Sequence, residues 1–126
     1  MTTTPTSNAS AATDLPGSAS DSSAPVVVTA VFTPRPETFD EVSAALSRAI
    51  AEVHEEPGCL LYAIHRDPDD RIVMLEKWAS VESLDAHGTG RAVERLGASL
   101  EGLLAEPTVV TRMTPIPAGT ESQGQL

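Results

Sequence analysis

The sequence predicts an α+β domain of the ferredoxin-like type, in which an antiparallel sheet carries helices on one face. Apolar runs of strand length and segments with helical apolar spacing follow one another as strand, helix, strand, strand, helix, strand. That order is the split βαβ arrangement. The middle pair of strands is apolar on both faces, and one layer of helices covers only one of them. We therefore expect a homodimer in which two sheets pack together as a dimeric α/β barrel.

The folded domain is expected over residues 26–115 of the 126-residue chain. Residues 1–25 are rich in Ser, Thr, Ala and Pro and contain few large apolar side chains, so we expect a disordered tail. This segment has neither the basic start nor the apolar stretch of a signal peptide. Residues 116–126 are expected to be a flexible C-terminal tail.

The first strand is predicted at residues 26–32 (VVVTAVF), a β-branched run that ends before two prolines. A helix follows, with Thr38 as the expected N-cap and Glu41 as its capping-box partner. Pro57 and Gly58 end this region. The apolar side chains at helical spacing are Phe39, Val42, Leu46, Ala49, Ile50 and Val53.

Residues 59–66 (CLLYAIHR) and 72–78 (IVMLEKW) are predicted to form a β-hairpin around the turn residues 67–70 (DPDD). The pairing register decides which side chains share a face, because a slip of one residue exchanges the two faces. The sequence leaves both registers open.

The remaining elements are a broken helix and a last strand. Ser80 is a suitable N-cap for a short helix that carries His87, and residues 88–90 (GTG) interrupt it. A strand is predicted at residues 108–113 (TVVTRM). The apolar stripe of the longer second helix is formed by Ala92, Val93, Leu96, Leu100, Leu103 and Leu104.

Charge and composition exclude several classes of function. The net charge is −10 and there is no basic stripe, so nucleic acid and anionic membranes are poor partners. No apolar run has the length of a membrane span. The single cysteine, Cys59, excludes an intrachain disulfide and suits a cytoplasmic location. No phosphate loop, nucleophile elbow or metal-ligand spacing is present, so no metal or nucleotide cofactor is expected.

Several short motifs resemble the antibiotic biosynthesis monooxygenase family, whose members include small quinol and anthrone monooxygenases. They are Glu56-Pro57-Gly58-Cys59-Leu60, then Tyr62, Glu76, Trp78, Ala86-His87 and Leu104-Ala105-Glu106-Pro107. The resemblance covers about residues 26–114. It implies a homodimer with one pocket per subunit between the sheet and the helices. It also implies oxidation of an electron-rich substrate by O2 without metal, flavin or haem.

The chain departs from the family pattern in two places. Many relatives have a further histidine near the start of the last helix, where this chain has Gly88-Thr89-Gly90-Arg91. Arg91 would supply charge there but not a base. The first strand lacks the asparagine of the haem-degrading branch, which makes haem degradation a poor expectation.

Each candidate site residue has a functional and a structural interpretation. His87 is the first candidate for a base, since imidazole titrates near neutral pH, but it fits equally well as a core histidine. Tyr62 could donate a hydrogen bond to substrate or simply lie at the rim of the sheet. Glu76 needs a partner in its apolar strand, either a histidine that it orients or an arginine across the dimer. Trp78 could form a wall for the substrate, although a strand-terminal Trp is more often core.

The expected site thus has His87, Tyr62 and Glu76 as catalytic residues and Trp78, His65 and Arg91 as substrate-binding residues. The expected function is a cofactor-independent monooxygenase of the cytoplasm that oxidises a quinol, anthrone or related polyphenol with O2. The alternative is a non-catalytic dimer that binds a small aromatic molecule or serves as an accessory protein, because the fold alone does not determine activity.

Overall fold

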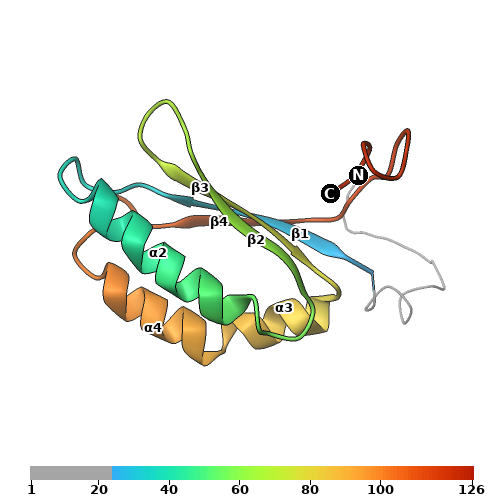
Figure 1. Cartoon of the computed structure of the whole chain (residues 1–126), viewed down its shortest axis with the longest axis horizontal. Helices are drawn as coiled ribbons and strands as arrows, with labels where there is room; N and C mark the ends of the chain where they lie inside the picture. Colours follow the sequence, from blue (N-terminus) through green and yellow to red (C-terminus); the bar gives the residue numbers. More distant parts are fainter. Residues whose placement is uncertain (1–23) are drawn as a thin grey trace.

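The structure, a computed structural model, describes residues 24–126. Its four strands form one antiparallel sheet in the order β2-β3-β1-β4, and its three helices lie together on one side of that sheet (Figure 1). This is the predicted ferredoxin-like α+β fold. The elements are β1 (Val26–Phe32), α2 (Phe39–Val53), β2 (Cys59–Arg66), β3 (Ile72–Trp78), α3 (Val81–Gly88), α4 (Arg91–Leu100) and β4 (Val109–Met113).

The core lies between the sheet and the helices. Alternate residues of β1 and β3 are buried, as expected for strands with one face on a core. From α2, the predicted apolar stripe reaches this core through residues such as Val42, Leu46 and Val53, none of which is more than 1% exposed. The packing therefore follows the predicted helical and strand periodicities.

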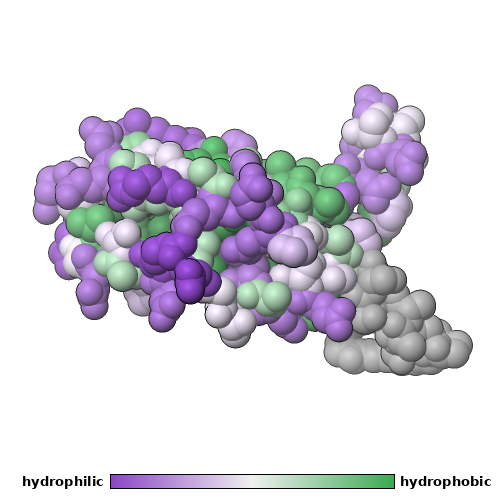
Figure 2. All heavy atoms as spheres, turned by 60° about the horizontal axis from the view of Figure 1, so that its bottom comes forward, coloured by the Kyte–Doolittle hydropathy of each residue, from purple (hydrophilic) through white to green (hydrophobic). Residues whose placement is uncertain are grey.

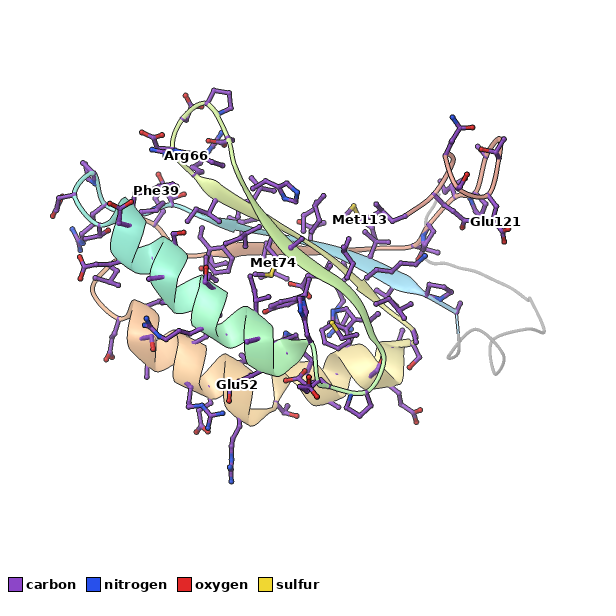
Figure 3. All side chains as sticks on the ribbon, viewed as in Figure 1. Phe39, Glu52, Arg66, Met74, Met113 and Glu121 are labelled. Carbon is purple, nitrogen blue, oxygen red and sulfur yellow. The ribbon has the colours of Figure 1, made fainter. Side chains whose placement is uncertain are left out.

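The strand pairing settles the register that the sequence left open. Tyr62 pairs with Glu76, and Ile64 pairs with Met74, so these side chains share the helix-covered face of the sheet. A β-bulge separates Cys59 from Leu61 in the pairing with β3. Figure 3 shows the two faces directly, with Met74 pointing toward the helices and Met113 lying on the opposite side of the sheet.

The opposite face of the sheet carries apolar side chains that no helix of the described chain covers. Val31 pairs with Val73 on one side and with Val109 on the other, and Leu75 belongs to the same face. Val109 is 60% exposed and Met113 is 39% exposed. This matches the predicted surplus of apolar surface on the central strands.

The two predicted N-caps have different outcomes. Ser80 caps α3 as predicted, since its hydroxyl accepts a hydrogen bond from the backbone N–H of Ser83. The capping box at Thr38 is wrong: Thr38 makes no side-chain cap to α2. Its hydroxyl donates instead to the carbonyl of Leu103 at 2.7 Å, a residue 65 positions away. The hydroxyl thus donates to a distant carbonyl and does not accept from the N–H groups of the first turn of α2.

The last helix is shorter than predicted. It ends at Leu100, and Gly102 follows with a φ of 80°. Leu103 and Leu104, which the sequence placed on the helical stripe, are partly buried against the core from the connection to β4. Backbone hydrogen bonds tie this connection to the segment after β1, including Arg35 N–H to Leu103 carbonyl at 3.0 Å.

The structure describes the C-terminal tail and only the end of the N-terminal one. The predicted disordered tail falls outside the described residues except for Ala24 and Pro25. The C-terminal residues contain a turn, in which the Gly124 N–H donates to the Thr120 carbonyl. Figure 1 shows this segment projecting from the end of the sheet, away from the helices. Across residues 24–126, no helix is long and apolar enough to cross a membrane.

Candidate functional site

A pocket of about 310 Å³ lies between the sheet and helices α3 and α4. All four strands and both helices contribute to its lining. Most of the lining is apolar, and the polar side chains are few. The lining residues are Val28, Ala30, Phe32, Tyr62, Glu76, Leu84, His87, Gly88, Val93, Leu96, Gly97, Leu100, Thr108, Val110 and Arg112.

The sheet places four of these residues in one row. Val28 of β1 pairs with Glu76 of β3 on one side and with Arg112 of β4 on the other, and Glu76 pairs with Tyr62 of β2. Paired residues share a face of the sheet, so all four side chains belong to the helix-covered face. The floor of the pocket therefore carries a phenol, a carboxyl and a guanidinium in a fixed order.

His87 enters the pocket from α3 and is held by Glu56. Its Nδ1 lies 2.8 Å from Glu56 Oε1, and its side chain is only 7% exposed. Glu56 belongs to the short segment between α2 and β2. A carboxylate at Nδ1 favours the tautomer that carries its hydrogen there, which leaves Nε2 without a hydrogen and able to accept a proton.

A glycine turn brings these two residues together. Gly58 has a φ of 85°, and a Cβ at this position would lie 2.5 Å from the Cβ of Ser83 on α3. Only glycine allows both the backbone conformation and this close contact. The turn after α2 thus packs against α3, the helix that carries His87, and supplies Glu56 from the same segment.

Two aromatic rings, those of Tyr62 and Trp78, pack against the histidine. The ring centroids of Trp78 and His87 are 4.6 Å apart, and those of Tyr62 and His87 are 5.2 Å apart. Trp78 is fully buried and does not line the pocket. Its indole N–H donates to Glu76 Oε1 at 2.9 Å. Trp78 therefore supports His87 by stacking and Glu76 by a hydrogen bond.

Burial changes the acidity of two pocket residues. The pKa of Glu76 is raised by burial, against the opposing influence of the Trp78 hydrogen bond and of His87 and Arg112. The pKa of Tyr62 is raised well above its usual value, first by burial and then by the charge of Glu76. Tyr62 is thus a hydrogen-bond donor at neutral pH.

The structure separates the predicted site residues into two groups. It brings Tyr62, Glu76 and His87 together around the pocket, with Trp78 directly behind them. His65 is exposed near the hairpin turn, where its Nδ1 lies 3.2 Å from the Val73 carbonyl, and it does not line the pocket. Arg91, the first residue of α4, is also exposed and absent from the lining.

Two further residues belong to the site but had no predicted role. Glu56 was part of the recognised motif, yet nothing in the spacing to His87, 31 residues away, indicated their contact. Arg112 lies on the last strand, and its place in the row depends on the pairing of β4 with β1. Glu76 was expected either to orient a histidine or to pair with an arginine across the dimer. Within the chain its hydrogen bond is to Trp78, and Glu56 holds the histidine.

The described residues 24–126 contain no group of three or more His, Cys, Asp or Glu side chains placed to hold a metal ion. The polar groups at the pocket are one imidazole–carboxylate pair, one buried carboxyl, one phenol and one guanidinium.

The family sequence profile described as antibiotic biosynthesis monooxygenase (ABM) matches residues 25–98. The chain belongs to the ABM family. A relative from Mycobacterium tuberculosis, named "Putative monooxygenase Rv0793", is 31% identical over 93 residues, which cover 73% of this chain and 92% of the relative. Its name agrees with the monooxygenase activity that the family description states.

Solved structures share the fold of this chain. The structure of Rv0793 superposes with a TM-score of 0.71 at 30% identity and covers 77% of this chain and 100% of its own. PA3566 from Pseudomonas aeruginosa, at 24% identity, has a TM-score of 0.68 over 75% of this chain and 97% of its own. The second likeness concerns the fold alone.

Proposed function

We propose that this ABM protein is a cofactor-independent monooxygenase that oxidises a quinol, an anthrone or a related polyphenol with O2. The observation that carries the proposal is the Glu56–His87 pair at an apolar pocket, with Nδ1 held by the carboxylate at 2.8 Å. A polyphenol that loses a proton becomes a reductant for O2. The protein then needs chiefly a base and a shaped, apolar pocket. In this proposal His87 is the base, and the lining between the sheet and the helices forms the pocket.

His87 is the base in this proposal. Its Nε2 takes the proton from a substrate hydroxyl, and Glu56 stabilises the imidazolium that forms. Because the ring is buried and stacked on Trp78, its orientation is fixed before the substrate arrives. Proton transfer therefore requires little rearrangement of the protein.

The substrate anion supplies the electrons. It reduces O2 within the pocket, and a new C–O bond forms at the ring carbon. One oxygen atom stays in the product as a carbonyl or hydroxyl group, and the other leaves as water with two hydrogens from the substrate. This balance needs no external reductant, which is why a pocket of this chemistry suffices.

Tyr62 and Glu76 stabilise the oxygen atoms of the substrate. Tyr62 keeps its hydrogen because burial raises its pKa, so it donates to a phenolate or ketone oxygen. Glu76 lies next to Tyr62 in the row, and its raised pKa favours the neutral form, which also donates. Both groups favour the charged state of the substrate over its neutral form.

The test is oxygen uptake by metal-free protein with a panel of hydroquinones and anthrones, after subtraction of spontaneous oxidation. We expect uptake above background and a loss of about 10²- to 10⁴-fold in kcat/KM for His87→Ala. Glu56→Gln should lower kcat to a smaller extent. His65→Ala is the matched control, because this exposed histidine lies outside the pocket, and it should leave the rate unchanged.

Two results would contradict this proposal. Equal rates for His87→Ala and the wild-type protein would remove the histidine from the reaction. An absence of uptake across the panel by the folded protein would favour the non-catalytic interpretation, in which the same pocket binds a small aromatic molecule as an accessory function.

We also propose that the functional unit is a homodimer. The uncovered sheet face, with Val109 at 60% exposure and Met113 at 39%, supports a second copy as its cover. A sheet that closes against its copy would bury both apolar faces at once.

A further inference from the structure

We infer that Arg112 forms an anion-binding entrance to the pocket, and that the substrate is a polyphenol that carries a carboxylate. This inference rests on the proposed oxygenase function and narrows its substrate class. It comes from the position of Arg112 in the row, from the weakness of its ion pair and from the charge of the surroundings.

Among residues 24–126, Arg112 is the one lysine or arginine that lines the pocket. It follows Val28 in the row, on the far side of Val28 from Glu76. It comes from β4, which lies at the edge of the sheet, whereas Glu76 comes from the interior strand β3. The Arg112 side chain is 51% exposed, whereas Glu76 and His87 are 5% and 7% exposed. The cation therefore stands at the open side of the pocket, and the carboxyl and His87 stand deeper.

The present partner of Arg112 is easily replaced. Its Nη2 donates to Asp85 Oδ1 on α3 at 2.8 Å, but the two side chains are 51% and 60% exposed. Ion pairs this exposed contribute little to stability. A guanidinium has five N–H donors, and the described structure shows one of them in use. An arriving carboxylate can therefore bind the remaining fork in a bidentate manner.

The rest of the pocket offers a carboxylate little support. The chain has 18 acidic residues against 8 basic ones, and the Glu56 carboxylate lies next to His87. A carboxylate, which stays charged throughout the reaction, is thus best placed beside Arg112. This places the carboxylate of the substrate at the entrance and its oxidisable ring against Tyr62 and His87.

The size of the pocket sets the size of the ring system. A volume of about 310 Å³ lies at the lower end of the ~300–1,000 Å³ range of small-molecule sites. This favours an aromatic acid of two or three fused rings. A larger polyaromatic compound would extend beyond the apolar lining.

The experiment compares two air-stable probes, 1-hydroxy-2-naphthoate and 1-naphthol, by isothermal titration calorimetry. They share the ring and the hydroxyl and differ in the carboxylate. We expect the wild-type protein to bind the acid about tenfold more tightly, the effect of one charge-assisted contact. Arg112→Gln should abolish this preference without changing the affinity for 1-naphthol. Asp85→Asn should strengthen binding of the acid by about threefold, because the competing carboxylate is gone.

Arg95→Gln is the matched control. It removes the same charge from an exposed arginine that pairs with Glu52 and lies outside the pocket. Its preference for the acid should equal that of the wild-type protein. An equal effect of Arg95→Gln and Arg112→Gln would show a general charge effect and overturn the inference.

The inference also fails if the wild-type protein shows no preference for the acid, if neither probe binds, or if Arg112→Gln weakens both probes equally. All of these outcomes are binding affinities, and none depends on turnover. A retained acid preference without oxygen uptake would therefore refute the proposed reaction alone, while a lost preference with normal uptake would refute the role of Arg112 alone.

Discussion

The two faces of the sheet are both apolar, yet they have very different surroundings. On the helix-covered face, Met74 is fully buried, and the polar residues among these side chains, Glu76 and His87, each have a partner. On the other face, Met113 is 39% exposed and Val109 is 60% exposed. Figure 2, seen from the helix side, shows hydrophobic surface reaching the outside between the hydrophilic helices and the C-terminal segment. One face is covered within the chain, and no helix of residues 24–126 covers the other.

The comparison teaches where chemistry resides in this fold. Burying a polar group costs free energy, and hydrogen bonds offset only part of that cost. The buried Glu76 and His87 on the covered face are therefore better explained by function than by stability. The open face has Lys77 at its edge, hydrogen-bonded to the Leu126 carbonyl. Successive residues of β3, such as Glu76 and Lys77, thus point to the core and to the proposed interface in turn.

The largest expected effect comes from Trp78→Ala on the covered face. Trp78 is fully buried and holds both Glu76 and His87. Its removal should lower the free energy of unfolding by about 3–5 kcal/mol, because it leaves a large cavity. Urea denaturation followed by circular dichroism measures this loss. Lys77→Ala, next along β3 on the opposite face, should change stability by no more than about 0.5 kcal/mol. Similar losses of unfolding free energy in the two variants would show that the two faces contribute equally to stability and would contradict the prediction.

The second prediction concerns the open face. If two copies pack through it, Leu75→Lys should place two charges in the interface and weaken dimerisation by about 100-fold or more. Sedimentation velocity should show a dimer for the wild-type chain and a monomer with unchanged circular dichroism for the variant. Ser47→Lys, on the exposed side of α2, is the control and should remain dimeric. A monomeric wild-type chain at the same concentrations would contradict the proposed homodimer.

The smallest predicted effect is a change in pH dependence. Burial raises the pKa of Glu76 in the folded chain above its value in the unfolded chain, so the folded state binds this proton more tightly. Stability is therefore lost as the pH rises from the ordinary carboxyl range through the raised pKa. Glu76→Gln keeps an acceptor for Trp78 and should remove this loss.

Urea denaturation at several pH values between 4 and 8 measures the effect. The curve for Glu76→Gln should decline less with rising pH than the wild-type curve, whereas Glu41→Gln, at an exposed position of α2, should follow the wild type. Parallel curves for Glu76→Gln and the wild-type protein would show that this carboxyl does not titrate differently in the folded state.

Local patterns were sufficient to predict most of the fold. The hairpin strands have the bounds that the sequence predicted, and α2 carries its apolar residues as expected. Ser80 caps α3 because its partner, Ser83, is three residues away in the chain. Thr38 does not cap α2, because its hydroxyl donates to Leu103, which only the folded chain brings near. Local hydrogen bonds are readable from sequence, and long-range ones are not.

The candidate site shows the same division. Glu76 was identifiable because a carboxyl is unusual in an apolar strand, His87 because imidazole titrates near neutral pH, and Tyr62 because it belongs to the motif shared with the family. Their order in space was not, since it depends on register. Glu56 and Arg112 escaped notice for a similar reason: one reaches His87 across 31 residues, and the other joins the row only through the pairing of β4 with β1.

The stacking of Trp78 on His87 gives this protein a built-in optical probe. Trp78 is the single tryptophan of the chain, so all indole emission comes from one ring whose centroid lies 4.6 Å from that of His87. Both rings lie beside the pocket residues Tyr62 and Glu76. A ligand that enters the pocket and moves any of these groups should therefore change the fluorescence of the unlabelled protein.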